Sequence, residues 1–562
     1  KECDWSSDVC SSDLENSTMK IHRITPSMRN FTAASLAVLI ALPGSVYAQT
    51  DNSKTKEESG TVTTSGSKLA TREQSDRHTA AKGWGLVKRG KAKPRKTDGA
   101  PYPATKLWKK KSPNAKEDWP PIPDGPLIGK LAPTVSPTSI KRIRQAKNQT
   151  LIDVFLPRKA YAAGQKINFH KFKSIVSAQP STSLCCAEIS VAQNGDTVIL
   201  TGNQWVSISL DGGTTFNTMN PTTIFPEDNG GMCCDQVVQY VPEHDMFVWI
   251  MQYWKSDNKN RLRLAAQTTA NLRNSNGTAW TYWDFPSETF STSGQWLDYN
   301  DVAIGENSLW WSSDIGGQRM VARLPLSQIA AKSTIYYSYT PPVSNARFSH
   351  VSQNGRDTVY WGGHISNSEL RVYSMKDFEG FYSWRSITVD SWPNNQNSSI
   401  CPDGTDWLNF DRSRHYVFGN VVQGNHVWMG WLAAAGGKFP EPHIQLVKIN
   451  TNTWSADDYT QIWNPKVAFG YPYLSTNEKN EIGMSVGLGG PDNNPAHAVG
   501  VLGDFVVHVP QVSSRCTTRW GDYNTARRSG SDPDQWVAGG YTMGTNTAGN
   551  PVQEPHYIRF SR

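Results

Sequence analysis

The sequence lacks several features that would assign it to common classes of protein. Its longest apolar run, around Ala33–Leu42, has about ten residues, whereas a membrane-spanning helix needs about 20. Helix-forming patterns are scarce from Ser181 onward. No named nucleic-acid motif is present, and residues 151–562 carry more Asp and Glu than Lys and Arg. These absences argue against a transmembrane segment, a helical fold and nucleic-acid binding.

Cysteine is sparse, and it lacks the C-x-x-C spacing typical of zinc sites. Two of the eight cysteines, Cys3 and Cys10, fall within residues 1–18. There the run DWSSDVCSSDL (Asp4–Leu14) resembles a reading frame of a common sequencing adapter, so we interpret residues 1–18 as an assembly artefact. The other six include two adjacent pairs, which favour disulfides over a thiolate metal site. We expect no metal and no other cofactor.

The N-terminal part reads as an export signal followed by a basic linker. Residues 19–48 combine basic residues, a short apolar run and Val46-Tyr-Ala48, the layout of a signal peptide, so we expect a secreted or periplasmic protein. Residues 49–150 hold 22 Lys/Arg and only 9 Asp/Glu, and they are rich in proline. This composition predicts a disordered linker, either a plain spacer or a tether to an acidic envelope or polysaccharide.

From Ser181 onward, short apolar strands alternate with turns in a unit of about 55 residues that occurs seven times. Such a unit is typical of a β-propeller, whose blades close into a ring. We therefore predict an all-β, seven-bladed propeller over residues 151–562, with six blades as the alternative. The last unit is one strand short, so a strand from Leu151–Leu156 or Ile167–Phe172 should complete it.

Two motifs carry a resemblance to known propellers. Ser209-Leu-Asp211-Gly-Gly213-Thr-Thr215-Phe216 resembles the Asp box of sialidase-like (BNR) propellers, in which the box implies a structural turn. Arg519-Trp-Gly-Asp-Tyr523 resembles the last blade of uncharacterised secreted bacterial propellers. The F/Y-R-I-P motif of true sialidases is absent from Phe155–Tyr161, so we expect a different activity.

The six remaining cysteines precede the first strands of several blades. Since first strands line the central channel, we expect all six near one rim of it. Blades 7, 1 and 2 are neighbours, which makes a bridge from Cys516 to blade 1 and a bridge between blades 1 and 2 sensible. The predicted disulfide cysteines are Cys185, Cys186, Cys233, Cys234, Cys401 and Cys516.

Polar and aromatic residues gather at the same predicted rim. Among them we expect Asp235, Asp298, Asp522, Tyr523 and Arg519 to be catalytic. The predicted substrate-binding residues are Glu188, Tyr299, His350, Asp406, Trp407 and Tyr471. For any single acid, a structural hydrogen bond is the alternative. Three histidines at equivalent positions, His443, His497 and His556, are predicted to pack rather than to bind metal, because third strands lie far from the channel.

These residues predict a monomer that acts on an extracellular glycan. Paired carboxylates favour a glycoside hydrolase. A polysaccharide lyase that uses Tyr523, His350 and Arg519, and a propeller that only binds a glycan or a protein, are the alternatives. Fold alone does not choose among them.

Overall fold

The computed structural model describes residues 79–100, 167–175 and 187–562, apart from gaps at 229–230, 257–258, 291–293, 410–411, 413, 505, 519, 522 and 546–550. The predicted artefact, the signal peptide and Leu151–Leu156 lie outside the described residues. So do four predicted site residues: Cys185, Cys186, Arg519 and Asp522. In the part described, no helix combines the length and apolar character needed to cross a membrane.

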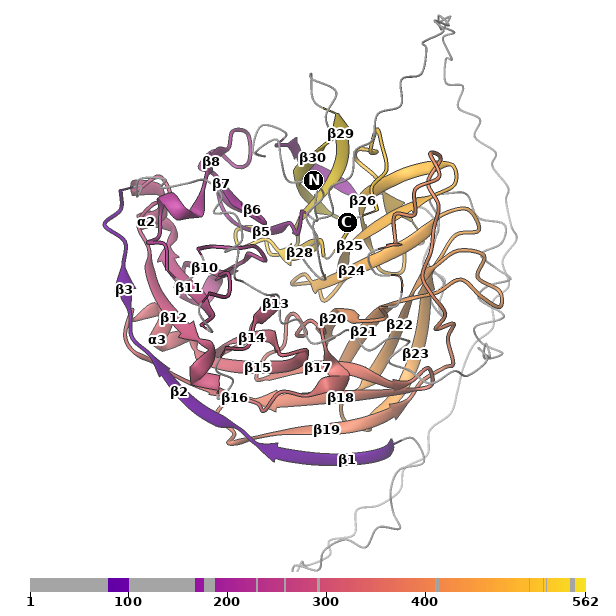
Figure 1. Cartoon of the computed structure of the whole chain (residues 1–562), viewed down its shortest axis with the longest axis horizontal. Coiled ribbons are helices and arrows are strands. Elements are labelled where there is room, and N and C mark those ends of the chain that lie inside the picture. The colour runs from indigo at the N-terminus through magenta and orange to yellow at the C-terminus, as the bar shows by residue number, and fades with distance from the viewer. Residues whose placement is uncertain are drawn as a thin grey trace, which may run out of the picture. The chain divides into compact units, whose positions relative to one another are not determined.

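The described chain forms seven antiparallel sheets, which are the blades of a β-propeller (Figure 1). Blades 1 to 3 contain β5 (Ser190–Asn194), β6 (Thr197–Gly202), β7 (Trp205–Ser209) and β8 (Asn217–Met219); β9 (Val237–Val241), β10 (Met246–Gln252), β11 (Arg261–Thr268) and β12 (Thr281–Pro286); and β13 (Leu297–Ile304), β14 (Ser308–Ile315), β15 (Gln318–Pro325) and β16 (Ile335–Tyr339).

Blades 4 to 7 contain β17 (Thr358–Ser366), β18 (Glu369–Lys376) and β19 (Phe381–Thr388); β20 (Val417–Gln423), β21 (His426–Ala433), β22 (His443–Asn450) and β23 (Ser455–Ile462); β24 (Ala468–Thr476), β25 (Ile482–Gly490), β26 (Asn493–Val501) and β27 (Val507–His508); and β28 (Thr525–Arg528), β29 (Trp536–Thr545) and β30 (Pro551–Ser561). The helices are short: α2 (Thr269–Asn274), α3 (Leu326–Ala330), and the 3-10 turns η2 (Pro221–Thr223), η3 (Pro242–His244), η4 (Ser287–Phe290) and η5 (Ser344–Ala346).

The strands next to the innermost one are buried on both faces, because each blade stacks between two others. Every residue of β10 (MFVWIMQ), β14 (SLWWSSDI) and β25 (IGMSVGLGG) is buried. Their near-continuous apolar runs, broken mainly by small residues, follow from this two-sided packing. The prediction of an all-β, seven-bladed propeller is confirmed.

The ring closes through a strand from the N-terminal side. Strand β4 (Asn168–Ser174) pairs antiparallel with β30, the third strand of blade 7, from Ser561↔Asn168 to His556↔Ser174. The last blade therefore takes its outer strand from the second of the two predicted segments.

Part of the predicted linker is ordered. Strands β1 (Thr79–Leu86), β2 (Lys88–Ala92) and β3 (Arg95–Lys96) pair with the outer edges of blades 4, 3 and 2 in turn. For this stretch the prediction of a disordered linker was wrong. A strand that adds to an open sheet edge is held largely by backbone hydrogen bonds, so it does not need the apolar content on which the prediction relied.

Side chains cross the central channel and tie non-adjacent blades together. The hydroxyl of Tyr473 on β24 donates to Asp301 Oδ1 on β13 at 2.9 Å. Arg527 on β28 donates to the Val302 carbonyl at 3.2 Å and to the Tyr473 hydroxyl, and its Nη2 lies 3.6 Å from Asp301 Oδ1. Blades 3, 6 and 7 are thus joined across the ring by a buried, charged cluster.

The turn after β7 is held by its own side chains. Asp211 accepts from the Thr215 hydroxyl at 2.6 Å and from the backbone N–H groups of Thr215 (2.8 Å) and Thr214 (3.0 Å). These bonds, that of the Thr215 hydroxyl first, hold the pKa of Asp211 well below its usual range. Ser209 Oγ accepts from the Gly213 N–H at 2.8 Å, and the Phe216 ring lies edge-on to Tyr557, 6.1 Å between centroids. The motif therefore closes a turn next to blade 7.

Candidate functional site

A backbone feature of the inner strands recurs in four blades. Near the start of the inner strand, blades 1, 2, 3 and 6 each have a non-glycine residue with positive φ: Glu188 (47°), Asp235 (41°), Tyr299 (50°) and Tyr471 (53°). L-residues rarely adopt this conformation, and the strand pairing of blades 3 and 6 shifts register there, as in a β-bulge. The repeat therefore builds the same local strain into several blades, as functional sites often do.

Three buried acids from blades 1, 2 and 3 form one cluster. The carboxyl groups of Asp235 and Glu188 hydrogen-bond to each other, and Asp235 Oδ2 accepts from the Tyr299 N–H at 3.1 Å. Burial raises the pKa of Asp235, and these two contacts oppose that rise. Burial, and then the charge of Asp235, raise the pKa of Asp298 to about 8. At neutral pH this arrangement therefore holds a protonated Asp298 beside the carboxyl group of Asp235, whose charge helps to keep that proton in place.

A hydrogen-bond chain fixes the carboxyl group of Asp298. Gln252 Nε2 donates to Asp298 Oδ1 at 2.9 Å, and Gln252 Oε1 accepts from Asn300 Nδ2 at 2.9 Å. Asn300 Oδ1 in turn accepts from Trp311 Nε1 at 3.1 Å. Every amide group in this chain is oriented by its neighbour. Asp298 is thereby positioned by residues of blades 2 and 3 that sequence reasoning missed.

An apolar wall lies beside Asp298. Cys233 and Cys234 form a disulfide between adjacent residues and pack with Trp296 and the partly buried Trp254. The two indole rings meet edge to face with centroids 5.4 Å apart. The Trp296 indole N–H lies close enough to Asp298 to favour its ionised carboxylate, which opposes part of the rise in pKa. The wall therefore joins aromatic surface directly to the acid cluster.

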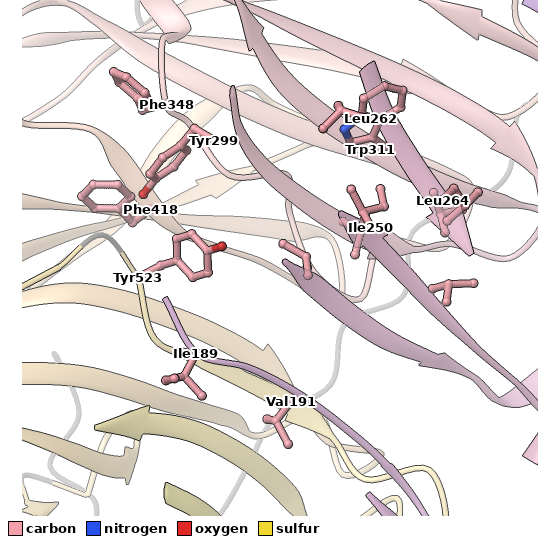
Figure 2. Close-up of a cluster of buried hydrophobic side chains, with 14 of the residues drawn as sticks. Ile189, Val191, Ile250, Leu262, Leu264, Tyr299, Trp311, Phe348, Phe418 and Tyr523 are labelled. Carbon is pink, nitrogen blue, oxygen red and sulfur yellow. The ribbon is translucent and has the colours of Figure 1, made fainter. Parts of the chain in front are cut away.

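Aromatic side chains from several blades meet next to Tyr299, and Figure 2 shows Phe348, Phe418 and Tyr523 around it. The Tyr299 ring lies 4.8 Å from Phe348, 5.8 Å from Tyr523 and 5.5 Å from His350, with which it is stacked. His350 is buried, and burial followed by the charges of two arginines lowers its pKa well below the usual value. His350 is thus neutral at physiological pH. The structure brings together the predicted residues Glu188, Asp235, Asp298, Tyr299, His350 and Tyr523.

Asp406 and Trp407 lie in the loop before blade 5, and Tyr471, on β24 of blade 6, packs against that loop. Asp406 accepts from the N–H groups of Ser399 (3.0 Å) and Leu408 (3.1 Å) and from Arg412 Nη2 (3.0 Å). The Trp407 ring is fully buried, 6.3 Å from that of Tyr471. Tyr471 donates to the Trp520 carbonyl at 2.8 Å. Asp406 therefore makes structural hydrogen bonds, which was the alternative to a catalytic or substrate-binding role for any single acid.

The three equivalent histidines are buried among packed strands. His497 Nδ1 lies 2.8 Å from His556 Nε2, and the His443 ring stacks on Phe439 with centroids 3.7 Å apart. Burial lowers the pKa of His443 and of His556 to about 3. These contacts agree with a packing role, and among the described residues the three do not converge on a possible metal site.

The predicted cysteine pairing was wrong, although disulfides are present. Cys516 bonds to Cys401, before blade 5, instead of to a blade 1 cysteine. Cys233 bonds to its neighbour Cys234 instead of bridging blades 1 and 2. The reason lies in the loops before blades 5 and 7. They meet over blade 6, where Cys516 Sγ lies 3.8 Å from the Thr405 carbonyl oxygen, so ring adjacency did not determine the partner.

The Cys401–Cys516 bond should contribute much more to stability than Cys233–Cys234. It closes a separation of 115 residues, so replacing both cysteines with Ser should lower the free energy of unfolding by about 3 kcal/mol. Replacing Cys233 and Cys234 together is the matched control, because that bond closes no chain loop. Chemical denaturation would measure both changes, and non-reducing peptide mapping would check the pairing. Equal losses in the two variants would contradict the assignment.

Comparisons with known proteins show only distant likeness. No protein-family model and no curated protein sequence matches the chain. A solved protein of unknown function from Dyadobacter fermentans is 9% identical with a TM-score of 0.36, over 70% of this chain and 99% of that chain. The BP39L lectin from Burkholderia pseudomallei is 12% identical with a TM-score of 0.35, over 65% and 94%. The α-L-arabinofuranosidase Arb93A from Fusarium graminearum is 11% identical with a TM-score of 0.32, over 74% and 98%. At these values the chain is similar to them in architecture alone.

Proposed function

We propose that this protein is an exported, monomeric, sialidase-like propeller that hydrolyses an extracellular glycan at the end of the channel where blades 1, 2 and 3 meet. One observation carries the proposal: Asp298, with a pKa of about 8, lies in the same buried cluster as Asp235. Glycoside hydrolases pair a carboxylic acid of raised pKa with a second, ionised carboxylate.

In this mechanism Asp298 donates its proton to the glycosidic oxygen as the bond to the leaving sugar breaks. Asp235 is the anionic partner, as nucleophile or as base for the attacking water, according to its distance from Asp298 across the bound sugar. The backbone N–H of Tyr299 holds the Asp235 carboxylate at 3.1 Å. Trp254, which is only partly buried, supplies an aromatic face on which a sugar ring can stack.

A lyase is the second candidate, and the contact of His350 with Tyr523 favours it. The two rings lie 5.9 Å apart, and His350 is held neutral, as a general base requires. In that reaction a base removes a proton next to a uronate carboxyl group, and the leaving sugar departs to give an unsaturated product. The absorbance of that product distinguishes the two chemistries.

The test is a panel of extracellular glycans incubated with the purified protein and assayed for new reducing ends and for unsaturated sugars. We expect reducing ends without unsaturation, and a fall of about 10²- to 10⁴-fold in rate for Asp298→Asn, the range typical of a lost general acid. Asp377→Asn is the matched control. It removes another buried carboxylate, which accepts from Asn307 at 3.2 Å on the side of blade 3 away from the acid cluster.

Each other outcome contradicts the hydrolase proposal. Unsaturated products would establish the lyase. Binding of a glycan without cleavage would establish a binding propeller. Equal losses in Asp298→Asn and Asp377→Asn would show that Asp298 is structural.

A further inference from the structure

The N-terminal strap, residues 79–98, runs along the outer edges of three consecutive blades (Figure 1, indigo). Strand β1 pairs with β19 from Thr79↔Ile387 to Leu86↔Phe381. Strand β2 pairs with β16 along its whole length, and β3 pairs with β12 through Arg95 and Lys96. Blade 4 has three strands of its own, so β1 supplies its fourth. A single short segment thus covers three sheet edges.

Glycines set the register of the strap. Gly83, Gly85 and Gly90 stand directly opposite Trp384, Tyr382 and Tyr337 in the strand ladders. A Cβ atom added at these glycines would lie 2.7, 2.7 and 2.3 Å from the facing ring. Each ring therefore lies over the bare backbone of its glycine, a pairing that stabilises glycine in a strand. A shift of the strap by one residue would place a side chain under every ring.

The C-terminal end of the strap is held by charge and by specific hydrogen bonds. Arg95 Nη1 lies 3.0 Å from Asp284 Oδ2, and its guanidinium covers the Tyr282 ring at 5.1 Å. The Thr97 N–H donates to the Trp280 carbonyl at 3.0 Å, and Thr97 Oγ1 accepts from the Trp280 N–H at 2.9 Å. The strap therefore carries its own recognition elements from end to end.

We propose that the outer edges of blades 2, 3 and 4 are a recognition site for a glycine-spaced basic strand, and that the strap remains bound there after the chain between residues 100 and 167 is cut. All the contacts named above are made by residues 79–97. The chain that connects the strap to β4 makes none of them, and it only raises the effective concentration of the strap at the blade edges. Strand addition gives affinity through the backbone, and the glycine–ring pairs give specificity. The segment that precedes the strap would then stay attached to a cleaved propeller.

The test uses the full chain with a site-specific protease sequence inserted after residue 125. The folded protein is cut and passed over a gel-filtration column. We expect the N-terminal fragment to co-elute with the propeller and to separate from it only in denaturant. Release of the fragment from the native protein upon cutting would overturn the proposal.

Two variants test the basis of recognition. Gly83→Val combined with Gly85→Val and Gly90→Val should abolish co-elution after cutting, because the added side chains displace the three rings. Ala81→Val, at an exposed position of β1, adds a side chain without changing the charge of the strap; it is the control and should leave co-elution intact. Melting curves of both uncut variants verify that the propeller is folded. A triple variant that still co-elutes after cutting would refute recognition through the glycines.

Discussion

Asp298→Asn is expected to stabilise the protein at pH 8 by several kcal/mol and to remove much of the decline in its stability between pH 5 and pH 8. Folded Asp298 keeps its proton to a pKa of about 8, whereas an unfolded Asp loses it near pH 4. Through that window the folded state binds more protons, so raising the pH favours unfolding. Four pKa units at about 1.4 kcal/mol per unit set an upper limit of between about 5 and 6 kcal/mol.

Urea denaturation of the wild type and of Asp298→Asn at several pH values would measure the effect. Asn mimics the protonated acid and can still accept from Gln252, so the two proteins should be nearly equal in stability at pH 4. Asp235→Asn is the informative second variant. Because the charge of Asp235 helps to raise the pKa of Asp298, removing that charge should make the decline in stability end at a lower pH. An Asp298→Asn protein that is less stable than the wild type at every pH would contradict the assignment.

The propeller could be predicted because its signal is repeated and comes from hydropathy. Each blade needs apolar strands that pack on both faces, and this requirement recurs down the chain as runs such as Met246–Gln252 and Ser308–Ile315. Strand β4 could be anticipated from the missing strand of the last blade. The strap could not, because its glycines pair with rings more than 240 residues away in sequence. Glycine has no apolar side chain, so a hydropathy pattern predicts a linker at Gly83 and Gly90.

The acid cluster could be predicted because its members recur with the repeat. The residues that support it could not, because they do not recur. Glu188, Asp235 and Asp298 occupy related positions of successive repeats, so the period brings them together. Gln252 ends the second strand of blade 2 and Asn300 lies within the first strand of blade 3, and neither residue belongs to a motif. Disulfide partners were mispredicted because loops, which the repeat does not specify, decide which cysteines meet.

Arg527 offers the clearest test of the cluster that crosses the channel. Its guanidinium is buried, and its positive charge opposes the effect of burial on Asp301, whose pKa is raised to about 6. Removing one partner of a buried ion pair leaves an uncompensated charge and costs about 3–5 kcal/mol. We therefore expect Arg527→Met to lower the free energy of unfolding by that amount at pH 7.5.

The pH dependence of that loss separates electrostatics from packing. Without Arg527 the pKa of Asp301 rises further, so the folded protein gains stability as the pH falls and Asp301 becomes neutral. The loss in Arg527→Met should therefore shrink at pH 5, and adding Asp301→Asn should recover part of it at pH 7.5. Arg528→Met, at the exposed end of the same strand, is the control and should change the stability by about 0.5 kcal/mol or less. A loss in Arg527→Met that is the same at both pH values and is not reduced by Asp301→Asn would mean that Arg527 acts by filling the channel and not through its charge.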